Sequence, residues 1–167
     1  MMTKTLYLIR HAKSSWGNPG LRDHDRPLNN RGLHDAPKMA LFLAENAAKP
    51  SLIITSTAKR ALSTALYFAD TFEIPEEKVR REAAIYEAHP TDVLKIIHQL
   101  PDTESCVLVF GHNPTFTSLA NVFSEDMYIE NVPTCGIVKI TTTAESWNKM
   151  YEGNAKVVAC YFPKEVL

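Results

Sequence analysis

The chain has 167 residues, of which 45% are hydrophobic and 22% are charged, and its net charge at pH 7 is −1. This length and balance fit one globular domain with a substantial core, and we expect residues 1–167 to form it. Because the net charge is near zero, a global basic field is excluded, and neither nucleic acid nor a membrane surface is an expected partner. Any anion site must therefore be local.

Targeting signals and cysteines give a consistent prediction for the compartment. No apolar run approaches the roughly 20 residues of a membrane helix, and the first run ends at Arg10, too early for a secretory signal. The three cysteines, Cys106, Cys135 and Cys160, are widely spaced and odd in number. They indicate free thiols in a reducing cytoplasm.

Three short apolar runs, residues 5–10, 52–56 and 106–111, predict strands that are buried on both faces. After each of the first two runs, apolar residues recur every three or four positions, which predicts a helix. One stripe contains Leu33, Ala36, Ala40, Leu43 and Ala47, and the other contains Ala58, Leu62, Ala65, Ala69 and Phe72. Pro37 interrupts the first stripe, so we expect either a kink or a helix that begins near Asp35 with the proline in its first turn.

Two further helices are predicted from capping patterns. Residues 89–100 read as a helix with Thr91 at the N-cap, and residues 112–123 as a helix with Asn113 at the cap and Pro114 at the first helical position. The runs at 136–141 and 156–162 flank a turn and predict edge strands, some of them antiparallel. The alternation of strands and helices predicts a three-layer α/β/α fold with a doubly wound, mostly parallel sheet.

Polar residues with chemical potential follow three of the predicted strands. Arg10 and His11 end the first strand, Arg60 opens the helix after the second, and His112 ends the strand at 106–111. In such sheets, ligands bind outside the carboxyl ends of the strands, where we expect these four side chains to meet. Guanidinium forks match phosphate oxygens, and a neutral imidazole beside fixed positive charge is a competent nucleophile for phosphorus. The pattern predicts phosphoryl transfer.

The segments LIRHAKSSW, TSTAKRALSTA, IYEA and VFGHNP resemble the motifs of the histidine phosphatase superfamily, and DHDRPLNNRG resembles a loop of its small phosphohistidine phosphatase branch. The resemblance covers roughly residues 5–120 and implies a phosphoglycerate mutase-like fold. It also implies that His11 accepts the phosphoryl group while Arg10, Arg60 and His112 hold it. Glu87 matches the position of the general acid.

The chain departs from the family pattern in the loop after His11. Ala12 stands where glycine is usual, and Gly17 stands where many members have asparagine. Ser14 or Asn18 could supply the missing hydrogen bond to phosphate. We interpret His24 and His34 as solvated loop residues, His98 as facing solvent, and Arg26 as pairing with a neighbouring aspartate.

The leading hypothesis is a metal-independent phosphatase, with no cofactor, that acts through a covalent phosphohistidine at His11. Only about thirty residues lie between Phe72 and Ser105, which leaves no room for the lid of larger relatives, so we expect an open pocket suited to a phosphohistidine on a protein. Alternatives are a phosphomonoesterase acting on a small phosphorylated metabolite and a non-catalytic module that binds phosphate. A mutase is disfavoured without a lid, and a metallohydrolase is disfavoured because metal-ligand spacing is missing.

Overall fold

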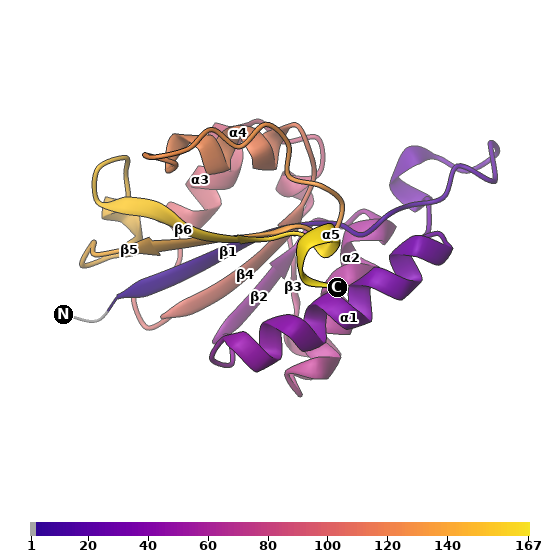
Figure 1. The fold of residues 1–167 in the computed structure, drawn as a ribbon, viewed down its shortest axis with the longest axis horizontal. Coiled ribbons are helices and arrows are strands. Elements are labelled where there is room, and N and C mark those ends of the chain that lie inside the picture. Colours follow the sequence, from indigo (N-terminus) through magenta and orange to yellow (C-terminus); the bar gives the residue numbers. More distant parts are fainter. Residues whose placement is uncertain (1–2) are drawn as a thin grey trace.

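A computed structural model describes residues 3–167, which form a six-stranded sheet with helices on both faces (Figure 1). The strand order across the sheet is β3-β2-β4-β1-β5-β6. The strands are β1 (Lys4–Arg10), β2 (Leu52–Thr55), β3 (Arg80–Arg81), β4 (Cys106–Gly111), β5 (Ile137–Thr142) and β6 (Ala155–Tyr161). The pairings among β3, β2, β4 and β1 are parallel, while β5 runs antiparallel to both β1 and β6. The predicted mixed sheet is confirmed.

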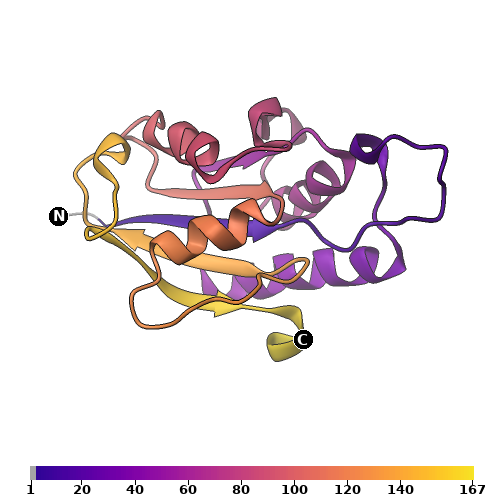
Figure 2. The same cartoon turned by 90° about the horizontal axis from the view of Figure 1, so that it is seen from above.

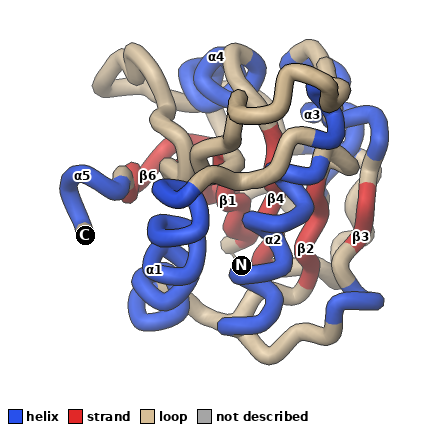
Figure 3. The backbone as a smooth tube through the Cα atoms, turned by 90° about the vertical axis from the view of Figure 1, so that its right-hand side faces the viewer, coloured by secondary structure: helices blue, strands red, loops and turns tan. Residues whose placement is uncertain are grey.

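The described residues form five helices: α1 (Asn30–Asn46), α2 (Lys59–Thr71), α3 (Pro90–His98), α4 (Thr115–Val122) and α5 (Pro163–Val166). Short 3-10 turns lie at Asp23–Asp25 (η1), Glu76–Lys78 (η2), Ala83–Ile85 (η3) and Trp147–Lys149 (η4). Helices α3 and α4 lie on one face and α1 and α2 on the other, which gives the expected three layers (Figures 1 and 3).

The sheet divides the core in two, and the central strand β1 contributes side chains to both parts. Leu6 and Leu8 pack with residues of α3 and α4, while Tyr7 and Ile9 pack with residues of α1 and α2. Successive side chains of a strand point to opposite faces, so an apolar run such as residues 6–9 is buried on both sides. This double burial explains why residues 6–9 are continuously apolar up to Arg10, the last residue of the strand.

The expectation that the first helix begins near Asp35, with Pro37 in its first turn, was wrong. The helix begins at Asn30, and Pro37 lies inside it. The start is set by Asn29, whose side-chain oxygen accepts the N–H of Gly32 at 3.0 Å. Burial of Ala36 and Leu43 on the same face compensates for the backbone hydrogen bond that the proline removes. Leu33, expected in the buried stripe, is instead exposed.

Other helix ends also shift from their predicted places. In α3, Pro90 is the first helical residue and His89 is the cap, so the assignment of Thr91 was wrong; the Asp92 carboxylate accepts the N–H of His89 at 2.9 Å. In α4, the helix begins at Thr115, and Asn113 satisfies the N–H of Thr117 at 3.1 Å. Proline and short polar side chains compete for these positions, and the sequence pattern leaves the boundary open by a residue or two.

The segment between Phe72 and Ser105 contains η2, β3, η3 and α3. Residues 11–29, which join β1 to α1, form a long arm that projects beyond the sheet, seen from two directions in Figures 1 and 2. None of the helices between residues 3 and 167 combines the length and apolarity needed to cross a lipid bilayer.

Candidate active site

The site lies where β1, β2 and β4 end side by side. The N–H of His11 donates to the carbonyl of Gly111 at 3.0 Å, which carries the parallel pairing one step beyond the strands. The rings of His11 and His112 have centroids 5.3 Å apart. Arg60 reaches the same place from the first turn of α2, which follows β2. The structure therefore brings together the four side chains selected from the sequence, Arg10, His11, Arg60 and His112.

His11 is buried and is held in one tautomer. Its Nδ1 lies 2.7 Å from the carbonyl oxygen of Ala12, and because a carbonyl only accepts, Nδ1 must carry the proton. Nε2 therefore keeps its lone pair. Burial is the main cause that lowers the pKa of His11 to about 3, and the positive charges of Arg60 and Arg10 act in the same direction. The imidazole is neutral and available as a nucleophile at physiological pH.

The loop behind His11 tolerates alanine in place of glycine. Ala12 is fully buried, and its N–H donates to the Thr64 hydroxyl of α2 at 3.0 Å. Ala12 does not adopt a positive φ angle; the described non-glycine residues that do are Glu73, Glu87 and Cys135. Ala12 therefore occupies this tightly packed position without backbone strain.

Two arginines present unsatisfied donors. Arg10 donates from Nη1 to the carbonyl of Val132 at 3.1 Å, and Arg60 donates from Nη1 to the carbonyl of Asp23 at 2.7 Å. In both side chains Nε is buried and has no hydrogen-bond partner. Burial, together with the nearby charge of Arg60, lowers the pKa of Arg10, although a guanidinium remains charged at any physiological pH.

His112 also presents an unsatisfied nitrogen. Its Nε2 lies 2.8 Å from the hydroxyl oxygen of Ser56, and that oxygen already accepts the N–H of Ala58 at 3.2 Å. A hydroxyl can accept a second hydrogen bond as well as donate one, so both directions fit this contact; when Ser56 donates to Nε2, the ring proton lies on Nδ1. Nδ1 is buried without a partner, and burial followed by the charge of Arg60 lowers the pKa of His112 to about 4.

These unpartnered atoms all belong to one corner of the molecule, which is formed by Arg10, His11, Arg60 and His112. Within residues 3–167, the buried side-chain nitrogens and oxygens that lack a partner are the Nε atoms of Arg10 and Arg60 and the Nδ1 of His112. An unpaired buried polar group costs about 1–3 kcal/mol, so native structures rarely keep one without a functional reason. The Nε–H groups of Arg10 and Arg60, together with Nδ1 of His112 when it carries the ring proton, match the oxygens of a phosphoryl group beside the neutral His11.

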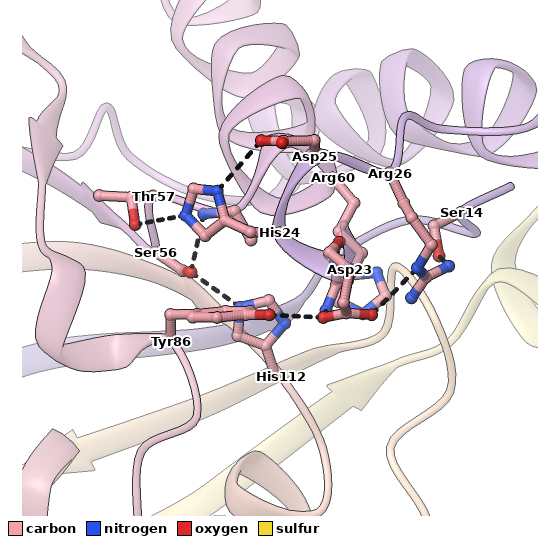
Figure 4. A network of polar contacts seen from close by, with 12 residues as sticks. Ser14, Asp23, His24, Asp25, Arg26, Ser56, Thr57, Arg60, Tyr86 and His112 are labelled. Atoms are coloured by element: carbon pink, nitrogen blue, oxygen red, sulfur yellow. Dashed lines mark hydrogen bonds and ion pairs between the residues drawn. The ribbon is translucent and has the colours of Figure 1, made fainter. Parts of the chain in front are cut away.

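The sequence reasoning missed Asp23, which holds the outer end of Arg60 (Figure 4). Its carboxylate accepts from Arg60 Nη2 at 2.9 Å, from Tyr86 Oη at 2.7 Å and from Arg26 Nε at 3.0 Å. The predicted pairing of Arg26 with a neighbouring aspartate is confirmed. Asp23 lies on η1 in the projecting arm, 37 positions from Arg60, and no local pattern marks such a contact.

Ser14 and Asn18 make other bonds. The Ser14 hydroxyl is buried and accepts from Arg26 Nη1 at 2.7 Å, while the exposed Asn18 accepts the N–H of Gly20 at 3.0 Å within its own loop. Across the described chain, neither side chain forms a hydrogen bond with the four residues that make up the corner. Their assignment to phosphate binding stays a prediction.

Glu87 lies at the rim of the corner. It is exposed, has a φ of 56°, and borders a cavity of about 390 Å³ that is also lined by His89, His112 and Asn113. A left-handed backbone is unfavourable for glutamate by roughly 1–2 kcal/mol, and such strain tends to cluster at functional sites. The cavity extends from His112 along the start of α3 and α4, where a leaving group could lie.

The predictions that His24 is a solvated loop residue and that His98 faces solvent were wrong. His24 is half-buried, with Nε2 at 2.9 Å from the Thr57 hydroxyl, and it packs edge-on against Tyr86. His98 is also half-buried, with Nε2 at 2.7 Å from the carbonyl of Met150. In each case a partner far along the chain supplies the hydrogen bond, so position in a loop or helix could not reveal it. His34 is mostly exposed, as expected.

The comparisons with known proteins identify the family of the chain. The sequence profile of the histidine phosphatase superfamily (branch 1) matches residues 6–93. A protein of Mycobacterium tuberculosis, named only as uncharacterized, is 31% identical over 165 residues, which cover 93% of this chain and 100% of the relative.

Two solved structures share the fold. One from Agrobacterium tumefaciens, provisionally described as the phosphohistidine phosphatase SixA, is 27% identical with a TM-score of 0.78 and covers 95% of this chain and 97% of its own. The structure of the protein histidine phosphatase SixA complexed with tungstate has a TM-score of 0.81 at 18% identity, with 98% of this chain and 99% of the other covered. The chain belongs to the histidine phosphatase superfamily and has its phosphoglycerate mutase-like α/β fold.

Proposed function

We propose that this chain is a metal-independent phosphatase that passes a phosphoryl group from its substrate to His11 and then to water. The observation that carries the proposal is the set of three buried, unpartnered nitrogens on Arg10, Arg60 and His112, beside a His11 whose Nε2 lone pair is free. This arrangement supplies a nucleophile and donors for the charge that develops on the phosphoryl oxygens. Among residues 3–167, no cluster of three metal-ligating side chains accompanies it.

The proposed reaction has two displacements at phosphorus. In the first, Nε2 of His11 bonds to phosphorus while the bond to the leaving group breaks, and the leaving group keeps the electron pair and takes up a proton. In the second, a water oxygen attacks phosphorus, the P–N bond breaks, and its electron pair returns to Nε2 as phosphate leaves. We assign to Glu87 the roles of giving the first proton and of taking one from water; its position in the lining of the cavity beside His112 supports this assignment.

Protein phosphohistidine is the substrate class that we favour. The related SixA structures carry that activity in their descriptions, and one of them was solved with tungstate, a tetrahedral oxyanion. We further propose that residues 1–167 work as one domain without a lid, since residues 72–105 contain only one strand of two residues and one full helix. An uncovered pocket admits a side chain that projects from another protein. Free Cys106, Cys135 and Cys160 support a reducing, cytoplasmic setting.

Trapping the intermediate tests the mechanism. The enzyme is mixed with a radiolabelled phosphoryl donor, quenched, and digested to locate the label. We expect label on His11 that is stable to base and labile to acid, lost in His11→Ala and kept in the matched control His34→Ala, whose ring is exposed and bonded to Asp35. Turnover that survives His11→Ala would remove the mechanism, and binding of phosphopeptides without turnover in the wild type would favour a non-catalytic reader.

A substrate panel tests the specificity. Phosphohistidine peptides, phosphoserine peptides and sugar phosphates are compared by kcat/KM, each with and without a chelator. We expect phosphohistidine to be preferred and the chelator to have no effect. A preference for a sugar phosphate would reassign the enzyme to small phosphorylated metabolites with the same chemistry, and activity lost to the chelator and restored by zinc or manganese would overturn the metal-independent mechanism.

A further inference from the structure

The outer end of Arg60, which carries Nη1 and Nη2, is bound by a single residue, Asp23. Its Nη1 donates to the Asp23 carbonyl at 2.7 Å and its Nη2 to the Asp23 carboxylate at 2.9 Å. Arg60 is buried, with 6% of its surface exposed. A guanidinium is planar and rigid, so two bonds from one side fix both its plane and the direction in which the remaining N–H groups point.

Fixing the outer end leaves the inner edge for the substrate. The Nε of Arg60 is buried and has no partner, and the planar fork offers further N–H groups that Asp23 does not use. Arg10 shows the same division: Nη1 is bound by the carbonyl of Val132, and Nε is buried without a partner. In both arginines, a protein acceptor holds one side while the other stays unsatisfied in the corner beside His11.

Asp23 is itself held from several sides. Tyr86 donates its hydroxyl to Oδ2, and Arg26 donates Nε to Oδ1. Arg26 is buried, stacks 3.5 Å from the ring centroid of Trp16, and donates Nη1 to the Ser14 hydroxyl. The hydrogen bonds from Tyr86, Arg60 and Arg26 hold the pKa of Asp23 well below its usual range, so the carboxylate stays charged.

We propose that Asp23 is a positioning residue for phosphate recognition, which aims the inner edge of Arg60 at the substrate by binding its outer end. The inference rests on the proposed function, because it requires that the corner binds a phosphoryl group. It assigns a role to the projecting arm: η1 brings a carboxylate to an arginine of α2, and Tyr86 and Arg26 keep that carboxylate in place. Asp23 acts only through Arg60 and does not touch the reacting phosphorus.

The opposite role makes the opposite prediction. A carboxylate on a phosphate-binding arginine could instead occupy the place of the substrate anion and compete with it. Removal of a competitor tightens anion binding, whereas removal of a positioning residue weakens it. The sign of the change in affinity therefore separates the two roles.

The test measures tungstate affinity by isothermal titration calorimetry, which needs no turnover. The variants are Asp23→Ala, Asp23→Asn and the matched control Asp25→Asn; Asp25 lies on the same turn but pairs with Arg22 and His24. We expect Asp23→Ala to weaken binding by at least about tenfold, as for a misplaced charge-assisted hydrogen bond, and Asp23→Asn to fall between it and the wild type. The control should stay within about twofold of the wild type.

A double-mutant cycle shows whether Asp23 acts through Arg60. In an Arg60→Ala background, adding Asp23→Ala should change tungstate affinity by less than about twofold, because the group that it positions is gone. A general structural role would weaken binding equally in both backgrounds, and that result would overturn the inference. Tighter binding by Asp23→Ala, or an affinity equal to that of the control, would overturn it as well.

A milder variant covers the case in which Asp23→Ala does not fold. Tyr86→Phe removes one donor to Asp23 and keeps the ring against His112, and it should weaken tungstate binding by about two- to threefold only when Arg60 is present. No weakening would then overturn the inference. Labelling of His11 in the wild type is run in parallel, so failure of the proposed function appears as an unlabelled enzyme, separately from the affinities of the variants.

Discussion

The buried, neutral state of His11 predicts that acid destabilises the fold in a defined pH range. In the unfolded chain a histidine takes up a proton near pH 6.5, whereas in the folded protein the pKa of His11 is lowered to about 3, mainly by burial. At high pH both states are neutral and stability is unaffected. As the pH falls below 6.5, only the unfolded state binds the proton, so the free energy of unfolding decreases until the folded pKa is reached.

The size of the effect follows from that difference in pKa. Each pH unit in the range costs about 1.4 kcal/mol per histidine, and the full interval for His11 corresponds to about 5 kcal/mol. His112, with its pKa lowered to about 4, adds a second loss of similar slope over a shorter range. Total stabilities of small domains are about 5–15 kcal/mol, so the corner that prepares the nucleophile makes the protein markedly sensitive to acid.

Urea denaturation at several pH values between about 7.5 and 4.5 measures this slope. Wild type is compared with His11→Asn, which leaves a polar side chain near the carbonyl of Ala12 but cannot be protonated. Between about pH 5.5 and 4.5 we expect the wild-type slope to exceed that of the variant by about 1.4 kcal/mol per pH unit. Parallel curves would refute the argument that His11 is buried and neutral in the folded state.

Three further predictions concern the same corner. At Gly32, an added Cβ would lie 2.2 Å from the backbone oxygen of Lys13, so Gly32→Ala should displace the loop after His11. Thermal unfolding should show a free energy of unfolding lower by about 1–3 kcal/mol, and kcat should fall as well. Unchanged values of both would contradict this close approach. Glu87→Gln should reduce kcat for an alkyl phosphate ester by about 100-fold or more and affect phosphohistidine less, because an imidazole can be protonated before it leaves; a kcat for the ester within about twofold of the wild type in a steady-state assay would exclude Glu87 as the acid. Tungstate at about 100 times its dissociation constant should add about 2.7 kcal/mol to the free energy of unfolding in urea titrations, and no gain would show that the unpartnered donors do not bind the oxyanion.

The strands could be predicted from local patterns more reliably than the ends of the helices. Strands such as β1 and β4 were clear because burial on both faces demands continuous apolar residues, and the polar residues after them stand out. The start of α1 was missed because Asn29, not Pro37, decides it, and a proline can be accommodated when the buried stripe around it packs well. Helix ends depend on single hydrogen bonds, which patterns locate only within a residue or two.

The order of strands and the residues at their ends determined the place and the chemistry of the site. Parallel strands finish at one edge, so Arg10, His11 and His112 had to meet there once the sheet formed. The tertiary structure alone decided what holds Arg60, because its partner Asp23 comes from an arm without periodicity whose path is set by contacts with distant residues such as Tyr86. Burial that repeats along a strand or helix depends on residues that are close in sequence, so the sequence pattern predicts it. A hydrogen bond between distant loops forms only when the whole chain has folded, so no local pattern predicts it.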